Sequence, residues 1–240
     1  MSAELDPETG AILLVDKPVT WTSFNVVAKI RAALRALTGR RVKVGHAGTL
    51  DPLASGLLVI GTGGCTKQLP HLTEEDKCYT ATLRLGQTTA SYDAETPVEQ
   101  ERPWQHVDDE AVRMALHRFT GPQMQTPPSF SAKRFQGERA YRLARAGEEV
   151  AIPPVPIIIH RLQQVGRQGA DLHLDITCSK GTYIRTLADD IGRELGCGAY
   201  LTALRRTASG HFHVRDARTP EMWSQWLDRW AARRQQGQGA

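Results

Sequence analysis

The sequence has no apolar run that approaches the roughly 20 residues needed to cross a bilayer, so no transmembrane helix is expected. Its first residues, MSAELDPETG, have neither a basic start nor an apolar core, which argues against a secretory signal peptide. The four cysteines, at positions 65, 78, 178 and 197, form no CxxC pair, so reduced thiols are expected. These absences favour a cytoplasmic protein.

Metal ligands and phosphate loops are also missing from the sequence. The eight histidines are scattered. His211 and His213 would share one face of a strand, but no third ligand lies near them in the sequence. No glycine-rich phosphate loop is present either, and we therefore expect neither a metal nor a cofactor. The length of 240 residues suits one sizeable domain, alone or with a small addition.

The net charge of +4 is small, but arginine greatly outnumbers lysine. The guanidinium group matches phosphate geometry, which points to nucleic acid, although a GC-rich genome would enrich arginine as well. The position of the arginines is more informative than their number. Apolar residues at helical spacing predict a helix from Thr22 to Leu37, ended by Gly39. Basic residues lie on this helix and directly after it: Arg31, Arg35, Arg40, Arg41 and Lys43.

Hydrophobic periodicity predicts alternating strands and helices in the rest of the chain. Buried strands are expected at 11–18 and 56–61, and a strand at 77–86 places Tyr79 on its apolar face. A helix at 108–119 would begin at Asp108 and end at Gly121. The segment 172–196 predicts a strand, a turn at Gly181 and a helix closed by Gly196. A stripe of tryptophans on a final helix predicts core packing: Trp223, Trp226 and Trp230.

Two charged residues stand out from their surroundings. Asp51 lies in GHAGTLDPLASG (45–56), a stretch of otherwise small and apolar residues with one histidine. It could be a solvated turn aspartate or a carboxylate held beside a substrate. Arg185 falls in the first turn of a predicted helix, where the helix dipole mildly disfavours a cation, so an anionic partner becomes more plausible.

The segment QTPPSFSAKRFQGERAYRLARAGEEVAIPP (125–154) is bracketed by proline pairs. From Lys133 to Arg145 it carries five basic residues against one acidic residue. Such a segment is typical of a surface insertion, and on charge alone a solvated helix face explains it as well as an RNA contact does.

Five blocks of the chain, in this order, resemble the TruB family of tRNA pseudouridine synthases. They are DKPVTWTSFNVV (16–27), VGHAGTLDPLASGLLVIGTGGCTK (44–67), DKCYTATLRLGQTT (76–89), PPSFSAKRFQGERAYRLARAG (127–147) and SKGTYIRTLADDIGRELGCGAYLTALRR (179–206). The sequence departs from the family pattern at a few positions. Glycine is usual at Thr20, aspartate at Asn25, tyrosine at Phe130 and lysine at Arg134. These departures affect local loop geometry and leave the reactive positions unchanged.

The resemblance implies an α+β fold with a mixed, mostly antiparallel central β-sheet flanked by helices. It implies one catalytic domain over residues 9–236, with a basic, helical, RNA-clamping insertion at about 124–154 and a disordered tail at 237–240. Most relatives carry a C-terminal RNA-binding domain, the PUA domain. Because only a short helix and a tail follow Arg206, we expect this domain to be absent.

The reaction implied by the resemblance converts a uridine in the T loop of tRNA, conventionally numbered 55, to pseudouridine. The bond from uracil N1 to ribose C1′ breaks, the base rotates, and C5 takes its place, without metal or cofactor. The resemblance makes Asp51 the nucleophile, with attack at C1′, elimination to a glycal and addition at C6 all open. It assigns Arg185 the role of holding Asp51 ionised. Tyr79 would stack beneath the flipped base, and its hydroxyl could serve as general base.

The remaining implied contacts are to the RNA. His46 would fill or hold the gap in the RNA loop, and Tyr183 and Leu204 would line the uracil pocket. Arg139 and Arg142 of the basic insertion would contact phosphates of the T stem-loop. The expected partner is tRNA, and the expected state is a monomer.

Two other functions remain open from the sequence. The same chemistry could act on a different RNA uridine, or the chain could act chiefly as a tRNA-binding folding chaperone. A DNA-binding module is disfavoured, because the sequence has no helix-turn-helix or zinc-finger signature.

Overall fold

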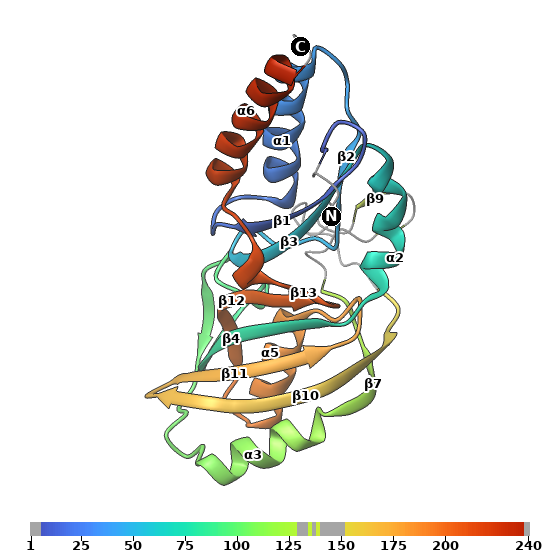
Figure 1. Ribbon diagram of the computed structural model, residues 1–240. Helices are drawn as coiled ribbons and strands as arrows, with labels where there is room; N and C mark the ends of the chain where they lie inside the picture. Colours follow the sequence, from blue (N-terminus) through green and yellow to red (C-terminus); the bar gives the residue numbers. More distant parts are fainter. Residues whose placement is uncertain (1–5, 129–133, 136–137, 140–151, 238–240) are drawn as a thin grey trace. The chain divides into compact units, whose positions relative to one another are not determined.

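The structure is a computed structural model that describes residues 6–128, 134–135, 138–139 and 152–237 (Figure 1). The chain divides into two compact units. Unit 1 is formed by Met1–Lys77 and Arg205–Ala240, and unit 2 by Cys78–Leu204. Strand β12 (Ala199–Ser209) contributes residues to both units, and the strand that begins at Lys77 has this first residue in unit 1 and the rest in unit 2.

The sheet of unit 1 is built around β3 (Ala54–Thr62), which pairs antiparallel with both β1 (Ile12–Lys17) and β2 (Val44–Ala47). Strand β13 (Phe212–His213) pairs antiparallel with the end of β12. Three short helical segments complete this part of the unit: η1 (Gly63–Gln68), α2 (Leu69–Glu74) and η2 (Val214–Asp216). The segment that carries Asp51 joins the end of β2 to the start of β3, so the pairing of these two strands fixes the positions of its ends.

Two helices of unit 1, α1 (Ser23–Thr38) and α6 (Pro220–Gly237), lie side by side (Figure 1). Helix α1 begins and ends as predicted, because Thr22 accepts a hydrogen bond from the Asn25 amide and Gly39 takes a left-handed conformation with φ 68°. The tryptophan stripe is core, as predicted: Trp223 and Trp230 are buried with Leu227 against the apolar face of α1, and Trp226 packs at the edge of the same cluster.

The sheet of unit 2 has the strand order β12, β4 (Lys77–Leu85), β11 (Asp171–Cys178), β10 (Val155–Gln168) and β7 (Gly121–Gln125). Strand β10 is antiparallel to both of its neighbours. A separate antiparallel pair is formed by β5 (Gln87–Thr89) and β6 (Val98–Glu101). The mostly antiparallel pairing confirms the predicted α+β class.

The core of unit 2 lies between this sheet and two helices, α3 (Asp109–Arg118) and α5 (Ile184–Glu194). Alternate residues of β11, from Leu172 to Cys178, are buried in it, as the period-two pattern predicts. Tyr79 packs against the same cluster, on the strand face predicted for it. Helix α3 stops at Arg118, and Gly121, predicted as its end, begins β7 with φ 107°.

Between residues 129 and 151, the structure describes the basic insertion at only four residues. Arg134–Phe135 (β8) and Glu138–Arg139 (β9) pair antiparallel, so at these positions the insertion is a strand pair and not the predicted helix. Arg142 lies outside the described residues, as do residues 238–240 of the predicted tail. None of the helices in the described part of the chain has the length and apolar character needed to cross a membrane.

Candidate functional site

The predicted site residues are divided between the two units. His46 and Asp51 belong to unit 1, whereas Tyr79, Tyr183, Arg185 and Leu204 belong to unit 2. Asp51 and Arg185 therefore belong to different units, and their pairing stays a prediction.

Asp51 lies between β2 and β3. We call this segment, together with the first residues of β3, the nucleophile loop (Gly48–Leu57), after the role predicted for Asp51. The side chain of Arg206, only 1% exposed, fastens both ends of this loop. Its Nη2 donates to the carbonyl of Gly48 at 3.1 Å, and its Nε donates to the carbonyl of Leu57 at 2.7 Å. These two charged hydrogen bonds fix the distance between the Gly48 and Leu57 ends of the loop.

The middle of the nucleophile loop is held by the first residue of α1 and by the segment that precedes this helix. Leu50 forms two hydrogen bonds with the hydroxyl of Ser23, and the Thr20 amide donates to the carbonyl of Pro52 at 2.7 Å. Thr20 adopts φ 75°, a left-handed conformation that is rare for a β-branched residue. This explains why a glycine is usual there. Asp51 is therefore flanked on both sides by anchored residues.

Lys17, at the end of β1, places a buried cation near Asp51. Its Nζ donates to the carbonyls of Pro18 at 2.9 Å and Trp21 at 2.6 Å. Burial lowers the pKa of Lys17 from 10.5 to about 8, while the Asp51 carboxylate acts to raise it and Arg206 to lower it. The attraction acts on both charges, so Lys17 supports an ionised carboxylate in the loop.

His46 lies on β2, opposite Ile60 of β3, and leads directly into the nucleophile loop. Burial lowers the pKa of His46 from 6.5, and the nearby Arg206 guanidinium lowers it further. The imidazole is therefore neutral at pH 7, and the RNA contact predicted for His46 stays a prediction.

In unit 2, Tyr183 and Arg185 are placed by the start of α5. Tyr183 is the N-cap residue of this helix, and the buried amide side chain of Gln125 holds its backbone from both sides. The Tyr183 amide donates to Gln125 Oε1 at 2.8 Å, and Gln125 Nε2 donates to the Tyr183 carbonyl at 3.0 Å. The Arg185 guanidinium, with the residue 5% exposed, lies 5.8 Å from the centre of the Tyr183 ring. The structure thus brings together Tyr183 and Arg185, two residues that the sequence assigned to the site in separate roles.

Tyr79 on β4 and Leu204 on β12 are both half-buried and pack against the core of unit 2. Each presents part of its side chain outside the core. Both side chains therefore lie at the edge of the core, and the stacking and pocket-lining roles predicted for them stay predictions.

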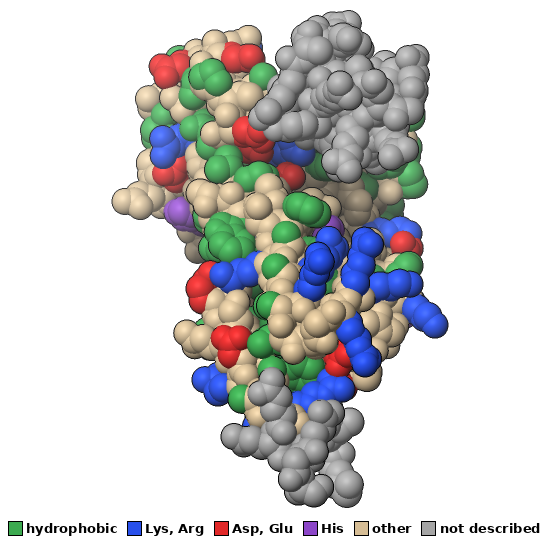
Figure 2. Space-filling view, turned by 90° about the horizontal axis from the view of Figure 1, so that it is seen from above, with side chains coloured by type: hydrophobic (Ala, Val, Ile, Leu, Met, Phe, Trp, Pro, Cys, Tyr) green, Lys and Arg blue, Asp and Glu red, His purple; other side chains and the backbone are tan. Residues whose placement is uncertain are grey.

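Basic residues gather on the face of the molecule seen in Figure 2. In unit 1, four basic residues at the end of α1 and just after it are exposed: Arg35, Arg40, Arg41 and Lys43. Arg139 of the insertion lies in β9, and nothing further is described of it. Arg35, Arg41 and Lys43 thus expose positive charge that suits a polyanion, whereas Arg40 is ion-paired with Glu8.

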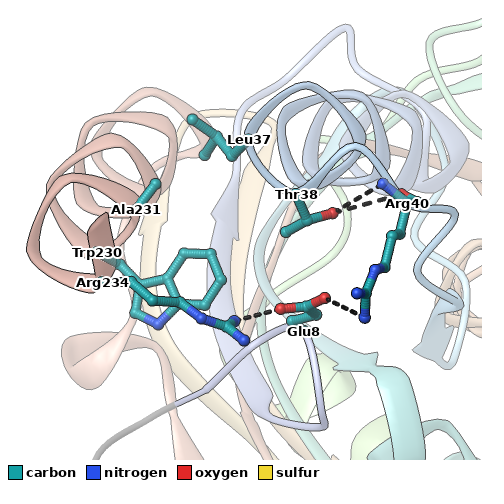
Figure 3. Close-up of a pocket in the computed structure, with 7 residues that line it drawn as sticks. All are labelled: Glu8, Leu37, Thr38, Arg40, Trp230, Ala231 and Arg234. Carbon is teal, nitrogen blue, oxygen red and sulfur yellow. Dashed lines mark hydrogen bonds and ion pairs between the residues drawn. The ribbon is translucent and has the colours of Figure 1, made fainter. Parts of the chain in front are cut away.

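A pocket of about 290 Å³ in unit 1 lies near the ends of α1 and α6 and contains none of the predicted site residues. Figure 3 shows Glu8 between Arg40 and Arg234 in this pocket. The Glu8 carboxylate lies 3.7 Å from Arg40 and also pairs with Arg234. These charges satisfy one another, so the pocket is a structural ion-pair site at the helix ends.

The nucleophile loop and the start of α5 fall within matches to known families. Residues 35–184 match the N-terminal domain of the TruB family pseudouridylate synthases, and residues 185–236 match the C-terminal domain of tRNA pseudouridylate synthase B. The chain belongs to the TruB family. This membership confirms the family, the enzyme class and the pseudouridine synthase fold predicted from the sequence.

Curated relatives support this TruB assignment over most of the chain. The tRNA pseudouridine synthase B of Chlorobium luteolum is 48% identical over 216 residues, which cover 90% of this chain and 74% of the relative. That of Phocaeicola vulgatus is 46% identical over 220 residues, covering 91% of this chain and 94% of the relative. The family thus contains members that this chain spans almost completely and others that it spans by three quarters.

Solved structures resemble this TruB protein at lower identity. The archaeal box H/ACA Nop10–Cbf5 complex matches with a TM-score of 0.67 and 25% identity, over 93% of this chain and 55% of that chain. An H/ACA RNP bound to a substrate RNA containing 2′-deoxyuridine matches equally well.

Sequence reasoning missed two residues that hold the nucleophile loop, Ser23 and Arg206. Arg206 shares a strand face with Leu204 and Ala208, so period-two alternation does place an arginine at a buried position. Ser23 carries no comparable local signal, because its contact is with a residue 27 positions away.

Proposed function

We propose that this TruB protein isomerises uridine to pseudouridine in the T loop of tRNA, at the uridine conventionally numbered 55, with Asp51 as the nucleophile. The observation that carries the proposal is the anchoring of the nucleophile loop. Arg206 binds its two ends, and the residues before and after Asp51 are hydrogen-bonded to Ser23 at the start of α1 and to Thr20 before it. A carboxylate placed by this many contacts is preorganised for attack, unlike one on a solvated turn.

The substrate in this proposal comes from the relatives. Those 48% and 46% identical are named tRNA pseudouridine synthase B, and a structural neighbour contains a substrate RNA. Exposed basic residues after α1 give this chain a surface that suits RNA phosphates.

The proposed reaction is balanced without any co-reactant. The N1–C1′ bond breaks, a C5–C1′ bond forms, and the proton on C5 is released to solvent as N1 gains one. Asp51 acts at C1′, through a glycal, or at C6, and each route needs an ionised carboxylate. Lys17 contributes a nearby cation, and we propose that Arg185 contributes a second one at the reacting end.

The uridine must leave the RNA stack to reach Asp51, which costs on the order of a few kcal/mol. We propose that Tyr79 offsets part of this cost by stacking, a contribution of about 1–3 kcal/mol per base. Tyr183 and Leu204 would contact the uracil, and the neutral His46 would occupy the gap left in the loop. Arg139 and Arg142 would bind phosphates of the T stem-loop.

The test uses an unmodified tRNA transcript tritiated at uridine C5. Wild-type protein should release one equivalent of tritium per tRNA, and sequencing should locate the product at the T-loop position. Asp51→Asn should release none while its Kd for tRNA stays within a few-fold of wild type. Turnover by Asp51→Asn would remove Asp51 as nucleophile.

Two further outcomes would redirect the proposal. Release at another position, or loss of other pseudouridines from a deletion strain, would indicate a different RNA target. Tight tRNA binding without any tritium release would favour the tRNA-folding chaperone, as would rescue of a deletion strain by Asp51→Asn.

A further inference from the structure

Ser23 is a buried polar residue at the first position of α1, only 3% exposed. Its hydroxyl accepts a hydrogen bond from the Leu50 amide at 2.8 Å and donates one to the Leu50 carbonyl at 3.1 Å. Both backbone groups of a single loop residue are therefore satisfied by one side chain. An N-terminal helix position does not need this arrangement, because the N-cap role is already filled by Thr22.

The two hydrogen bonds constrain the peptide planes on either side of Leu50. The Leu50 carbonyl belongs to the peptide unit that joins Leu50 to Asp51, and this unit is planar. Holding its oxygen against Ser23 therefore fixes the plane that also contains the Asp51 amide. The same plane contains the Asp51 Cα, so it fixes the point from which the Asp51 side chain leaves the backbone.

Ser23 bonds Leu50, the residue directly before Asp51. Arg206 binds carbonyls at Gly48 and Leu57, several residues away on either side. The carbonyl of Pro52 is held by the Thr20 amide, which is a main-chain group that substitution leaves in place. Removal of the Ser23 hydroxyl therefore releases the near side of Asp51 while the rest of the loop stays tied.

We propose that Ser23 is a positioning residue for the reaction, which orients Asp51 through the Leu50–Asp51 peptide. This inference rests on the proposed function, in which Asp51 is the reacting group. Ser23 itself does not touch the substrate. Its loss should slow the chemical step and leave tRNA binding intact, because a displacement of about 1 Å at a reacting group can cost roughly 100-fold in rate.

The test compares Ser23→Ala with Thr22→Ala. Thr22 is the adjacent residue in the same helix start, and its side chain bonds only within the cap, to Asn25. Single-turnover tritium release should fall at least about tenfold in Ser23→Ala, with the Kd for tRNA within threefold of wild type. Thr22→Ala should keep a rate within twofold of wild type, even if its Tm falls by as much as that of Ser23→Ala. Equal rates for the two variants, after each is shown to be folded, would overturn the proposal.

A second pair of variants covers the case in which Ser23→Ala does not fold. Ser23→Thr and Ser23→Val introduce side chains of nearly the same shape. Threonine has a hydroxyl where valine has a methyl group. The threonine variant should react at least fivefold faster than the valine variant, and hydrogen exchange of the Leu50 amide should be slower in it. Equal rates for this pair would refute the role of the hydroxyl.

The two proposals fail in different ways. Turnover by Asp51→Asn would remove the nucleophile assignment and this inference with it. An inactive Asp51→Asn together with a Ser23→Ala of wild-type rate would leave the nucleophile in place and remove only the role of Ser23.

Discussion

The guanidinium of Arg206 donates a hydrogen bond of 3.1 Å to the carbonyl oxygen of Gly48. Gly48 adopts φ 88°, and a Cβ atom there would lie 3.5 Å from Nη1 of Arg206. The glycine thus lets the backbone turn toward the buried cation. Gly48 and the buried Arg206 together hold the start of the nucleophile loop.

Replacing Arg206 should be far more damaging than replacing its neighbour. Arg206→Met leaves two buried carbonyls without a donor, each costing about 1–3 kcal/mol, so the free energy of unfolding should fall by on the order of 3 kcal/mol. Arg205 forms a half-exposed bidentate pair with Asp16 at 2.7 and 3.0 Å, and Arg205→Met should cost about 0–1 kcal/mol. Urea unfolding of both variants measures the difference. Similar losses of unfolding free energy in the two variants would show that the buried hydrogen bonds of Arg206 contribute no more than the exposed ion pair of Arg205.

The buried Lys17 should make stability depend on alkaline pH. Folding lowers the pKa of Lys17 from 10.5 to about 8, so the folded chain binds this proton less tightly than the unfolded chain. The penalty for burying the ammonium is fully present below pH 8 and disappears above pH 10.5. Relative to Lys17→Met, the wild type should therefore gain about 3 kcal/mol between these limits. Urea titrations at pH 7 to 10 test this, and a constant difference would contradict it.

Thr20→Gly should stabilise the protein. A β-branched residue in the left-handed region costs about 1–2 kcal/mol, and glycine removes this strain at some cost in unfolded-state entropy. We expect a net gain of up to about 1 kcal/mol in the free energy of unfolding. Thr49→Gly is the control, because Thr49 is exposed and is not among the non-glycine residues with positive φ in the described chain, so this change should destabilise. A loss of stability in Thr20→Gly would refute the account of φ 75° as strain.

Neutralising the insertion should change how tRNA binding responds to salt. Arg139→Gln with Arg142→Gln removes two proposed phosphate contacts, so the slope of log K against log salt should become shallower by about one to two. Arg113 and Arg118 on α3 are ion-paired with Glu110 and Glu194, and their double glutamine variant is a control with the same loss of charge. Binding isotherms at several salt concentrations measure the slope. An equal change in both double variants would indicate a general effect of net charge.

The strongly periodic elements of this fold could be predicted from the sequence. These elements are helix α1 with its Thr22 and Gly39 caps, strand β4 and the tryptophan stripe of α6. Each is predicted by the spacing of apolar residues within a short stretch of sequence. The family followed from long blocks that include Asp51 and Arg185. The insertion was harder, since its basic composition fits a helix or a strand pair equally well, and the described residues of β8 and β9 are paired strands.

The contacts that hold the nucleophile loop could not be predicted in the same way. The adjacent pair Arg205 and Arg206 suggests surface charge, yet one residue is half-exposed and the other is fully buried. Ser23 looks like an ordinary residue at a helix start. Its bond to Leu50 joins two segments that come together only when the β1–β3 sheet and α1 have formed, and no local pattern contains that information.

The division of unit 1 into two stretches of sequence has a consequence for synthesis on the ribosome. The apolar face of α1 emerges early, but its partners Trp223, Leu227 and Trp230 belong to the last helix. All of Cys78–Leu204 is translated in between, which takes on the order of ten seconds at about 5–20 residues per second. Unit 2 is continuous in sequence, whereas the part of α1 that packs against α6 stays uncovered until the last helix has emerged. A chaperone that binds nascent chains would therefore meet this protein first at α1.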